Sequence, residues 1–205
     1  GVTLWYEQLN TAIQTSPFVT ASSASISLLN GGVISQMGGP SVGVGGGATV
    51  ITSTSTIFDR NYALTAAGPM TLVNATPGTP KAMAVDGGGH WIDFPYKSGS
   101  FLVLQGNVQL NFSNTVIKNF YPAGISYGSS ATITYGDGVR LELGADLIIA
   151  SGDVAWTFTG DAEIDGNGAT LTINKSQGIT ITNAKTLTLR NMRIVTSTVD
   201  AFKCL

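Results

Sequence analysis

Two short segments define the architecture of this chain: Ala162-Glu-Ile-Asp-Gly-Asn-Gly-Ala-Thr-Leu-Thr-Ile173 and Leu187-Thr-Leu-Arg-Asn-Met-Arg-Ile194. Apolar residues alternate with polar ones, as in strands that are buried on one face. In the second segment the apolar positions are 187 and 189, which are odd, and then 192 and 194, which are even. The set of positions that faces the core therefore changes from odd to even at Asn191. A straight strand cannot change face in this way. A strand that turns a corner through one left-handed residue can, and Asn tolerates that conformation best after glycine.

Glycine-containing runs supply a second and sharper type of corner. Asp165-Gly-Asn-Gly168 and Asp86-Gly-Gly-Gly89 share the pattern Asp-Gly-x-Gly, whose residues permit left-handed and turn conformations. Asn114, with apolar positions 110, 112 and then 117, repeats the parity change seen at Asn191. We therefore predict eight structural corner residues: Asp86, Gly87, Gly89, Asn114, Asp165, Gly166, Gly168 and Asn191.

The two sets of corners suggest an internal repeat. Val85–Phe94 aligns with Ile164–Ile173 when the numbering is shifted by 79, and Leu102–Ile117 aligns with Ile179–Ile194 when it is shifted by 77. We interpret this as a repeat of about 79 residues, with copies at 82–118 and 161–195. Coils of roughly 20 residues, a period typical of solenoids, would place about four coils in each copy.

Further runs alternate with period two between residue 131 and residue 189, and the intervals between them are too short for a βα-crossover helix. An α/β fold is therefore excluded. Short strands, one-residue corners and glycine corners predict an all-β chain that coils into a right-handed parallel β-helix, or β-solenoid, over residues 31–205. The runs are Ala131–Tyr135, Val139–Leu143, Trp156–Phe158, Thr170–Ile173, Ile179–Ile181 and Thr186–Leu189.

Residues 1–30 are predicted to form an N-terminal cap or arm. Trp5, Leu9 and Ile13 are spaced by four residues and form one apolar stripe of a short candidate capping helix. Such a cap would cover the unpaired backbone that an open solenoid presents at its end. The eight glycines within residues 31–47 predict a loop after the cap.

Composition narrows the function classes. Only 11% of residues are charged, against roughly 25% in typical soluble domains, and 26 of 205 are glycine. The net charge is −2 and the basic residues are scattered, so no nucleic-acid partner is expected. No apolar stretch is long enough for a membrane span. The single cysteine, Cys204, excludes an internal disulfide and a cysteine-based zinc site.

The run Ala162–Ile173, followed by Leu187–Ile194, resembles the pectate-lyase-like right-handed parallel β-helix superfold, in which similar rungs recur. The resemblance extends to residues 82–118. It implies the fold, and it places the chain among polysaccharide-cleaving enzymes, phage tailspikes and bacterial surface proteins. The enzymes of the superfold use clustered acidic residues, often with Ca²⁺ and a nearby basic residue, whereas this chain has few acids.

Two groups of side chains are candidate sites. Asp161, Glu163 and Asp165 project to one side of one strand and could bind Ca²⁺ weakly, although a solvated edge is the preferred interpretation. His90, beside Trp91 and Asp93, could face a sugar ring, but a surface or packing role is preferred. We assign no catalytic residue, no metal site and no cofactor.

We therefore expect a non-catalytic extracellular structural or adhesive β-solenoid, secreted or held at a cell surface. Its expected partner is a second copy that stacks end to end into a filament or surface layer, with a surface glycan as a further candidate ligand. The alternative is a polysaccharide-cleaving or glycan-binding β-helix of the pectate-lyase-like kind. The fold hosts many functions, so the choice depends on a site.

Overall fold

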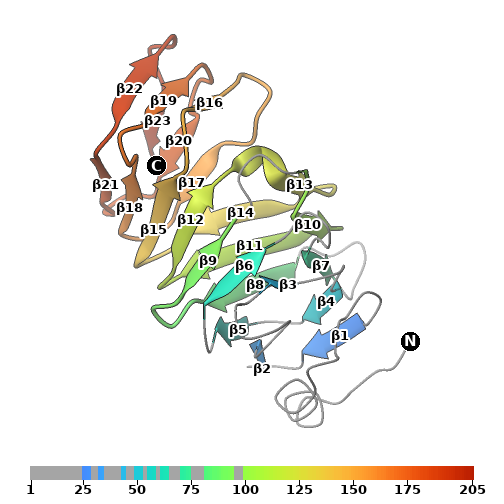
Figure 1. The fold of residues 1–205 in the computed structure, drawn as a ribbon. Coiled ribbons are helices and arrows are strands. Elements are labelled where there is room, and N and C mark those ends of the chain that lie inside the picture. The colour runs from blue at the N-terminus through green and yellow to red at the C-terminus, as the bar shows by residue number, and fades with distance from the viewer. Residues whose placement is uncertain are drawn as a thin grey trace.

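The computed structural model describes residues 25–28, 32–34, 43–44, 49–52, 55–58, 61–64, 70–74, 81–94 and 99–205. Within these ranges the chain forms 23 strands and one short 3-10 helix, η1 (Pro122–Gly124). Every strand pairing is parallel, and strands from successive coils lie on one another (Figure 1). The prediction of an all-β parallel β-solenoid is confirmed.

The strands form four sheets that run along the solenoid. Sheet 1 has five strands: β1 (Ser25–Leu28), β4 (Thr49–Thr52), β7 (Met70–Asn74), β10 (Leu102–Gln105) and β13 (Ile125–Tyr127). Sheet 2 has eight strands: β2 (Gly32–Ile34), β5 (Ser55–Phe58), β8 (Lys81–Asp86), β11 (Val108–Ser113), β14 (Thr132–Tyr135), β17 (Trp156–Phe158), β20 (Ile179–Ile181) and β23 (Phe202–Cys204).

Sheet 3 follows sheet 2 in each coil, and sheet 4 follows sheet 3 in the later coils. Sheet 3 has seven strands: β3 (Gly43–Val44), β6 (Tyr62–Leu64), β9 (Trp91–Asp93), β12 (Val116–Phe120), β15 (Val139–Leu143), β18 (Ala162–Asp165) and β21 (Leu187–Arg190). Sheet 4 has three strands: β16 (Leu147–Ile149), β19 (Thr170–Ile173) and β22 (Arg193–Thr196).

The length of a coil follows from the strand register. Trp156 is in register with Ile179, and Ile179 with Phe202, so each of these coils advances the numbering by 23. Partner positions in β8 and β11 differ by 27, as in the pair of Val85 and Phe112. The expected coil of roughly 20 residues is therefore too short, because each corner uses more residues than the alternation pattern alone reveals.

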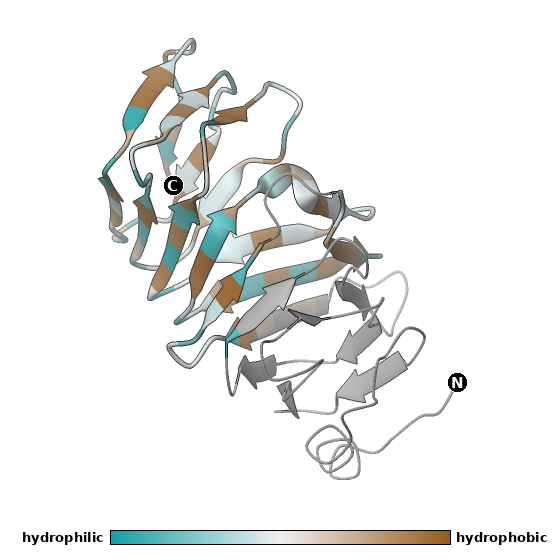
Figure 2. Ribbon diagram, in the orientation of Figure 1, coloured by the Kyte–Doolittle hydropathy of each residue, from teal (hydrophilic) through white to brown (hydrophobic). Residues whose placement is uncertain are grey.

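Inward-facing apolar side chains stack from coil to coil and form the core. In sheet 3 the column of Ile92, Ile117, Leu141 and Ile164 is at most 1% exposed. Figure 2 shows the same alternation as brown and teal or white bands along the strands of the later coils. Each inward residue thus packs on its equivalent in the neighbouring coils, which explains the period-two pattern of the sequence.

The two segments of the predicted repeat lie on different sheets. Val85 is in register with Phe112, then Tyr135, then Phe158, all in sheet 2. Ile164, which aligns with Val85 in the sequence, lies in sheet 3. Three coils lead from Val85 to Phe158, and the corner after β17 then leads to Ile164 in the next sheet. The Asp-Gly-x-Gly motif therefore occupies a different corner of the coil in each copy.

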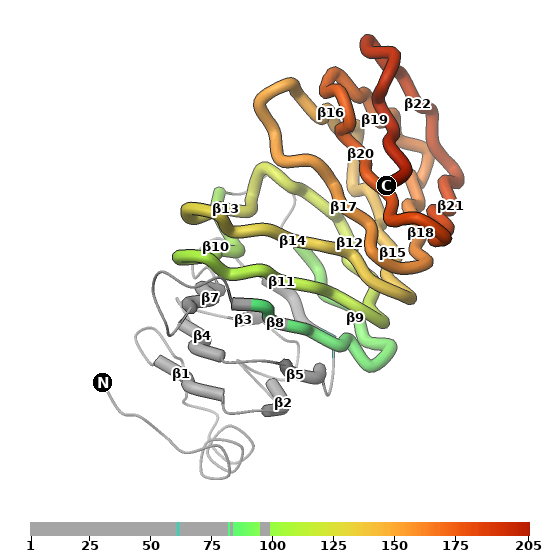
Figure 3. The backbone as a smooth tube through the Cα atoms, turned by 180° about the vertical axis from the view of Figure 1, so that it is seen from behind, coloured from blue at the N-terminus to red at the C-terminus, as the bar shows by residue number. Residues whose placement is uncertain are grey.

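One wall of the solenoid is interrupted. Up to β13 the chain passes through sheets 1, 2 and 3 in each coil, whereas from β14 onward it passes through sheets 2, 3 and 4. β13 ends sheet 1 and β16 begins sheet 4, and the two strands do not pair. Sheet 2 continues past this point, as the view from behind shows for β11, β14 and β17 (Figure 3).

The predicted N-terminal cap, with Trp5, Leu9 and Ile13, lies outside the described residues. Within the proposed cap region, Ser25–Leu28 already pairs with Thr49–Thr52 as part of sheet 1, and β2 and β3 lie within the expected glycine loop. Among the described residues no helix has the length and apolar character needed to cross a membrane.

Candidate functional site

The corner around Asp86 joins sheet 2 to sheet 3. Asn114, in the next coil, has a left-handed φ of 47°, and its side-chain amide donates to Asp86 Oδ1 at 3.2 Å. The same carboxylate oxygen accepts the N–H of Gly88 at 2.9 Å. Gly87 has no room for a side chain, because an added Cβ would lie 2.4 Å from Thr115 Cβ. These contacts hold consecutive coils together at the corner.

The corner around Asp165 joins sheet 3 to sheet 4 and has the same construction. Asn191 has a φ of 52°, and its amide donates to Asp165 Oδ1 at 3.1 Å. The N–H of Asn167 also donates to this oxygen, at 3.1 Å. A Cβ on Gly166 would lie 2.3 Å from Met192 Cβ. Six of the eight predicted corner residues thus take part in these contacts, and the other two, Gly89 and Gly168, have φ values of 83° and 86°.

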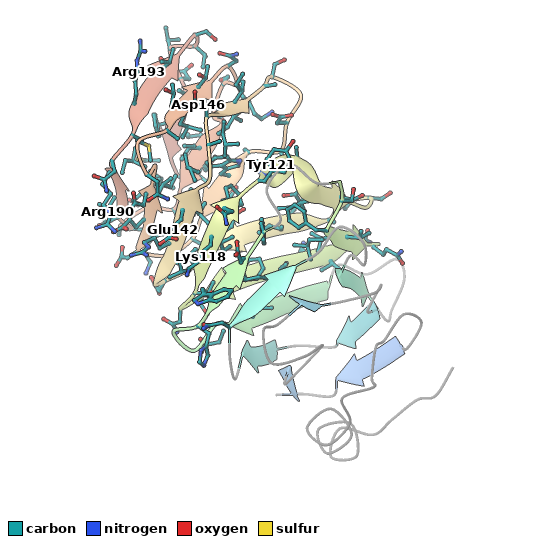
Figure 4. All side chains as sticks on the ribbon, in the orientation of Figure 1. Lys118, Tyr121, Glu142, Asp146, Arg190 and Arg193 are labelled. Carbon is teal, nitrogen blue, oxygen red and sulfur yellow. The ribbon has the colours of Figure 1, made fainter. Side chains whose placement is uncertain are left out.

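Charged side chains gather on the outward face of sheet 3. We call this group the charged ladder, and Figure 4 labels three of its members, Lys118, Glu142 and Arg190. Arg190 binds Glu163 at 2.8 Å and Asp165 at 3.1 Å, and Arg140 pairs with Glu142. The full ladder is Lys118, Arg140, Glu142, Glu163, Asp165 and Arg190.

The structure separates the three acids that the sequence pattern groups as a candidate Ca²⁺ site. Glu163 and Asp165 are in the charged ladder and share Arg190. Asp161 lies at the corner between sheets 2 and 3, where its Oδ1 accepts the N–H of Thr186 at 2.7 Å. No group of three His, Cys, Asp or Glu residues in the described ranges is arranged to hold a metal ion.

Two of the acids are held in the charged form by their hydrogen bonds. The N–H of Asn167 lowers the pKa of Asp165, against the opposing effect of burial, and Asn191 and Arg190 lower it further. The N–H of Asp161 and the ammonium of Lys185 lower the pKa of Asp137. Neither carboxyl is thereby suited to act as a general acid near neutral pH, since that role requires a raised pKa.

The group around His90 is a packed corner. Thr115 Oγ1 donates to the carbonyl of His90 at 2.8 Å, and the N–H of His90 donates to the carbonyl of Gly87 at 2.8 Å. Lys118 Nζ lies 4.5 Å from the centre of the Trp91 ring, so a cation already occupies one ring face. These contacts give the Trp91 side chain a structural role within the solenoid.

Cys204 is a free, exposed thiol.

A groove of about 450 Å³ lies where the wall is interrupted. We call it the sheet-break groove. It is bordered by η1, β13, β16 and the loop of residues 150–155 that follows β16, a region that Figure 1 shows in yellow and orange. The side chains that matter for its chemistry are Tyr127, Asp146, Ile148, Asp153, Val154 and Trp156.

The floor of the groove is aromatic and buried. Trp156 is 4% exposed, and its ring meets that of Phe120 edge to face at 5.0 Å. Burial raises the pKa of Tyr127 to about 12, so its hydroxyl stays neutral over the physiological range. The rim is different, because Ile148 is 59% exposed and Val154 is 45% exposed. The apolar side chains of the rim are therefore accessible to a ligand.

A second apolar surface lies at the last coil, which we define as residues 187–204 with β21, β22 and β23. Each of these strands ends its sheet and has one strand partner. Ile194 and Phe202 are 37% and 36% exposed, whereas their register partners in the preceding coil, Leu171 and Ile179, are fully buried. The inward side chains of this coil are therefore more exposed than their equivalents one coil earlier.

Sequence patterns reveal the corners but not the groove. One signal of it is present, because Leu147-Ile148-Ile149 breaks the alternation and places an apolar residue on the outward side of β16. Pro122, which begins η1, is a second signal of an irregular corner. The location of the groove itself depends on the missing pairing of β13 with β16, which no local pattern encodes.

Comparison of the chain with known protein families, with curated proteins and with solved structures finds no match.

Proposed function

We propose that this chain is a non-catalytic, extracellular structural or adhesive β-solenoid, of the pectate-lyase-like surface type, whose copies stack end to end. The observation that carries the proposal is the set of contacts between coils that occupy the acids. Asp86 and Asp165 accept the Asn amides of the next coil, and Glu163 and Asp165 bind Arg190.

Stacking of copies is the second part of the proposal. Every described strand pairing in the solenoid is parallel, and the edge of a sheet is a template for another strand. A second solenoid placed head to tail would continue three sheets at once and bury the inward side chains. Such a contact is heterologous, so it extends into a filament rather than closing.

The contacts of the acids favour a structural over a catalytic role. A pair of carboxylates that cleaves glycosidic bonds needs one free base or nucleophile and one acid with a raised pKa. In the charged ladder Glu163 and Asp165 both bind Arg190, and the pKa of Asp165 is lowered. The ladder therefore acts as a set of cross-links between coils, and secretion or surface display would follow from the structural role.

Association of the purified chain tests the proposal. Light scattering coupled to size exclusion should show mass increasing with concentration, together with filaments in negative-stain images. Ile194→Lys should weaken association about tenfold or more, since it places a charge in the buried contact. Val195→Lys is the matched control, because Val195 is next in sequence, adds the same charge and faces outward in register with Thr172.

Three outcomes would contradict the proposal. The wild-type chain could stay monomeric at millimolar concentration, or the two lysine variants could associate equally. The third is hydrolysis or elimination of an acidic polysaccharide in the presence of Ca²⁺, abolished by Asp165→Asn in a chain that still folds.

A further inference from the structure

The sheet-break groove is bordered by two strands that each end a sheet. β13 pairs with β10 alone and β16 with β19 alone, and both pairings are parallel. Ile125 and Tyr127 of β13 line the groove from one side, and Leu147 and Ile148 of β16 line it from the other. A terminal strand presents N–H and C=O groups that can pair with an added strand. The groove thus has the borders that an extended chain requires.

The rim of the groove favours an occupant with apolar side chains. Of the residues before the last coil whose side-chain burial the structure describes, Ile148 and Val154 are the only large apolar ones that are exposed. Thr172, the register partner of Ile148 in the next strand, is polar, so the apolar character is confined to the strand beside the groove. Trp156 is buried in the floor and has no open ring face on which a sugar could stack.

The charge of the groove favours a basic occupant. Among the described residues, Asp146 and Asp153 are the only charged ones that line it. One oxygen of Asp146 accepts the N–H of Thr170 at 2.7 Å, and one oxygen of Asp153 accepts the N–H of Ala150 at 2.7 Å. Neither carboxylate has an ion pair within the described part of the chain, in contrast to Glu163 and Asp165 of the charged ladder.

We propose that the sheet-break groove binds an extended segment of a partner protein in which apolar and basic residues alternate. The segment adds as a strand between β13 and β16, and its length of pairing is set by these two three-residue strands. Main-chain hydrogen bonds supply affinity, and alternate side chains supply specificity. The apolar residues cover Ile148 and Val154, and the basic residues meet Asp146 and Asp153.

A blocked heptapeptide of alternating Val and Lys is the probe. Titrated into isotope-labelled Ile194→Lys chain, which removes any effect of end-to-end stacking, it should shift the amide resonances of Tyr127, Ile148 and Val154. The double variant Asp146→Asn with Asp153→Asn should bind about fivefold more weakly, as expected for two exposed ion pairs. Asp137→Asn, at a corner outside the groove, should bind as before. Thermal melts of each variant establish that it is folded.

Two further probes separate strand addition from other modes of binding. A heptapeptide of alternating Val and Glu should not bind, and a Val–Lys heptapeptide with methylated backbone nitrogens should lose binding because it cannot donate to a strand edge. The proposal is overturned if no probe shifts these resonances at millimolar concentration, or if the methylated peptide binds equally. It is also overturned if a neutral hexasaccharide binds at these residues and the peptide does not.

Discussion

The corner around Asp86 and the corner around Asp165 have the same hydrogen-bond pattern at two different edges of the coil. In each, an Asp oxygen accepts one backbone N–H of its own turn and one side-chain amide from an Asn in the next coil. In each, a glycine N–H bonds across to that Asn, from Gly89 to Asn114 at 2.9 Å and from Gly168 to Asn191 at 2.6 Å. The same hydrogen-bond motif therefore forms a corner between sheets 2 and 3 and between sheets 3 and 4.

The difference between the two corners is a charge. Arg190 binds Asp165 Oδ2 through both Nε and Nη2 at 3.1 Å, whereas Ser113 stands at the equivalent register position beside Asp86. Asp165 is 7% exposed, while Asp86 is only half-buried. The corner around Asp165 thus has an additional link between coils that the corner around Asp86 lacks.

The largest expected loss of stability concerns the crowded glycine that the two corners share. Gly87→Ala and Gly166→Ala should each lower the free energy of unfolding by about 3 kcal/mol, because the new Cβ would overlap Thr115 or Met192 and a backbone carbonyl. Gly89→Ala and Gly168→Ala are matched controls, whose Cβ would meet nothing within 4 Å and whose cost of about 1 kcal/mol comes from a positive φ. Urea denaturation measures all four. Unequal losses at positions 87 and 166 would show that the corners are not equivalent.

A smaller loss of stability measures the contribution of Arg190, which only the corner around Asp165 has. Asp165→Ala should cost about 2 kcal/mol, since it leaves the N–H of Asn167 and the amide of Asn191 without an acceptor and removes one of the two carboxylates that bind Arg190. Asp86→Ala should cost about 1 kcal/mol, because its two donors are accessible to water. The same urea series gives both values. Equal losses would mean that Arg190 adds nothing to the corner.

The smallest effect is the pH dependence at Asp165. Its pKa in the folded chain lies below the value of about 3.9 in the unfolded chain, so the stabilisation is present above pH 4 and is lost as the pH falls through the folded pKa. The free energy of unfolding of wild type should therefore fall more steeply below pH 4 than that of Asp165→Asn. Urea melts from pH 6 to pH 2.5 test this, and parallel curves for the two proteins would refute it.

The corners are predictable from the sequence because each depends on local chemistry. Asn114 and Asn191 are recognisable from a change of parity within a short run, and the glycines from the turns they permit. The strand predicted at Val139–Leu143 has the same bounds in the structure, because its alternation is also a local pattern. The predicted coil is shorter than the observed one, because a corner adds residues that have no periodicity. The alignment of the two repeat copies does not indicate that they occupy different sheets.

The sites depend on pairing between coils, which sequence patterns do not record. Arg190 is 25 residues from Asp165, and only the register of β18 with β21 brings them together. The separation of Asp161 from Glu163 arises because β18 begins at Ala162, which leaves Asp161 in the corner. The groove results from a pairing that is absent, between β13 and β16.

The interruption of the wall also has a mechanical consequence. A force applied along the solenoid axis is carried by the hydrogen-bond ladders that join successive coils. Between the coil of β13 and the coil that begins at β16, only sheets 2 and 3 supply such ladders, through β14 with β17 and β15 with β18. Two ladders carry the force there and three carry it between β10 and β13, so we expect a solenoid pulled along its axis to separate between β13 and β16 before it separates between β10 and β13.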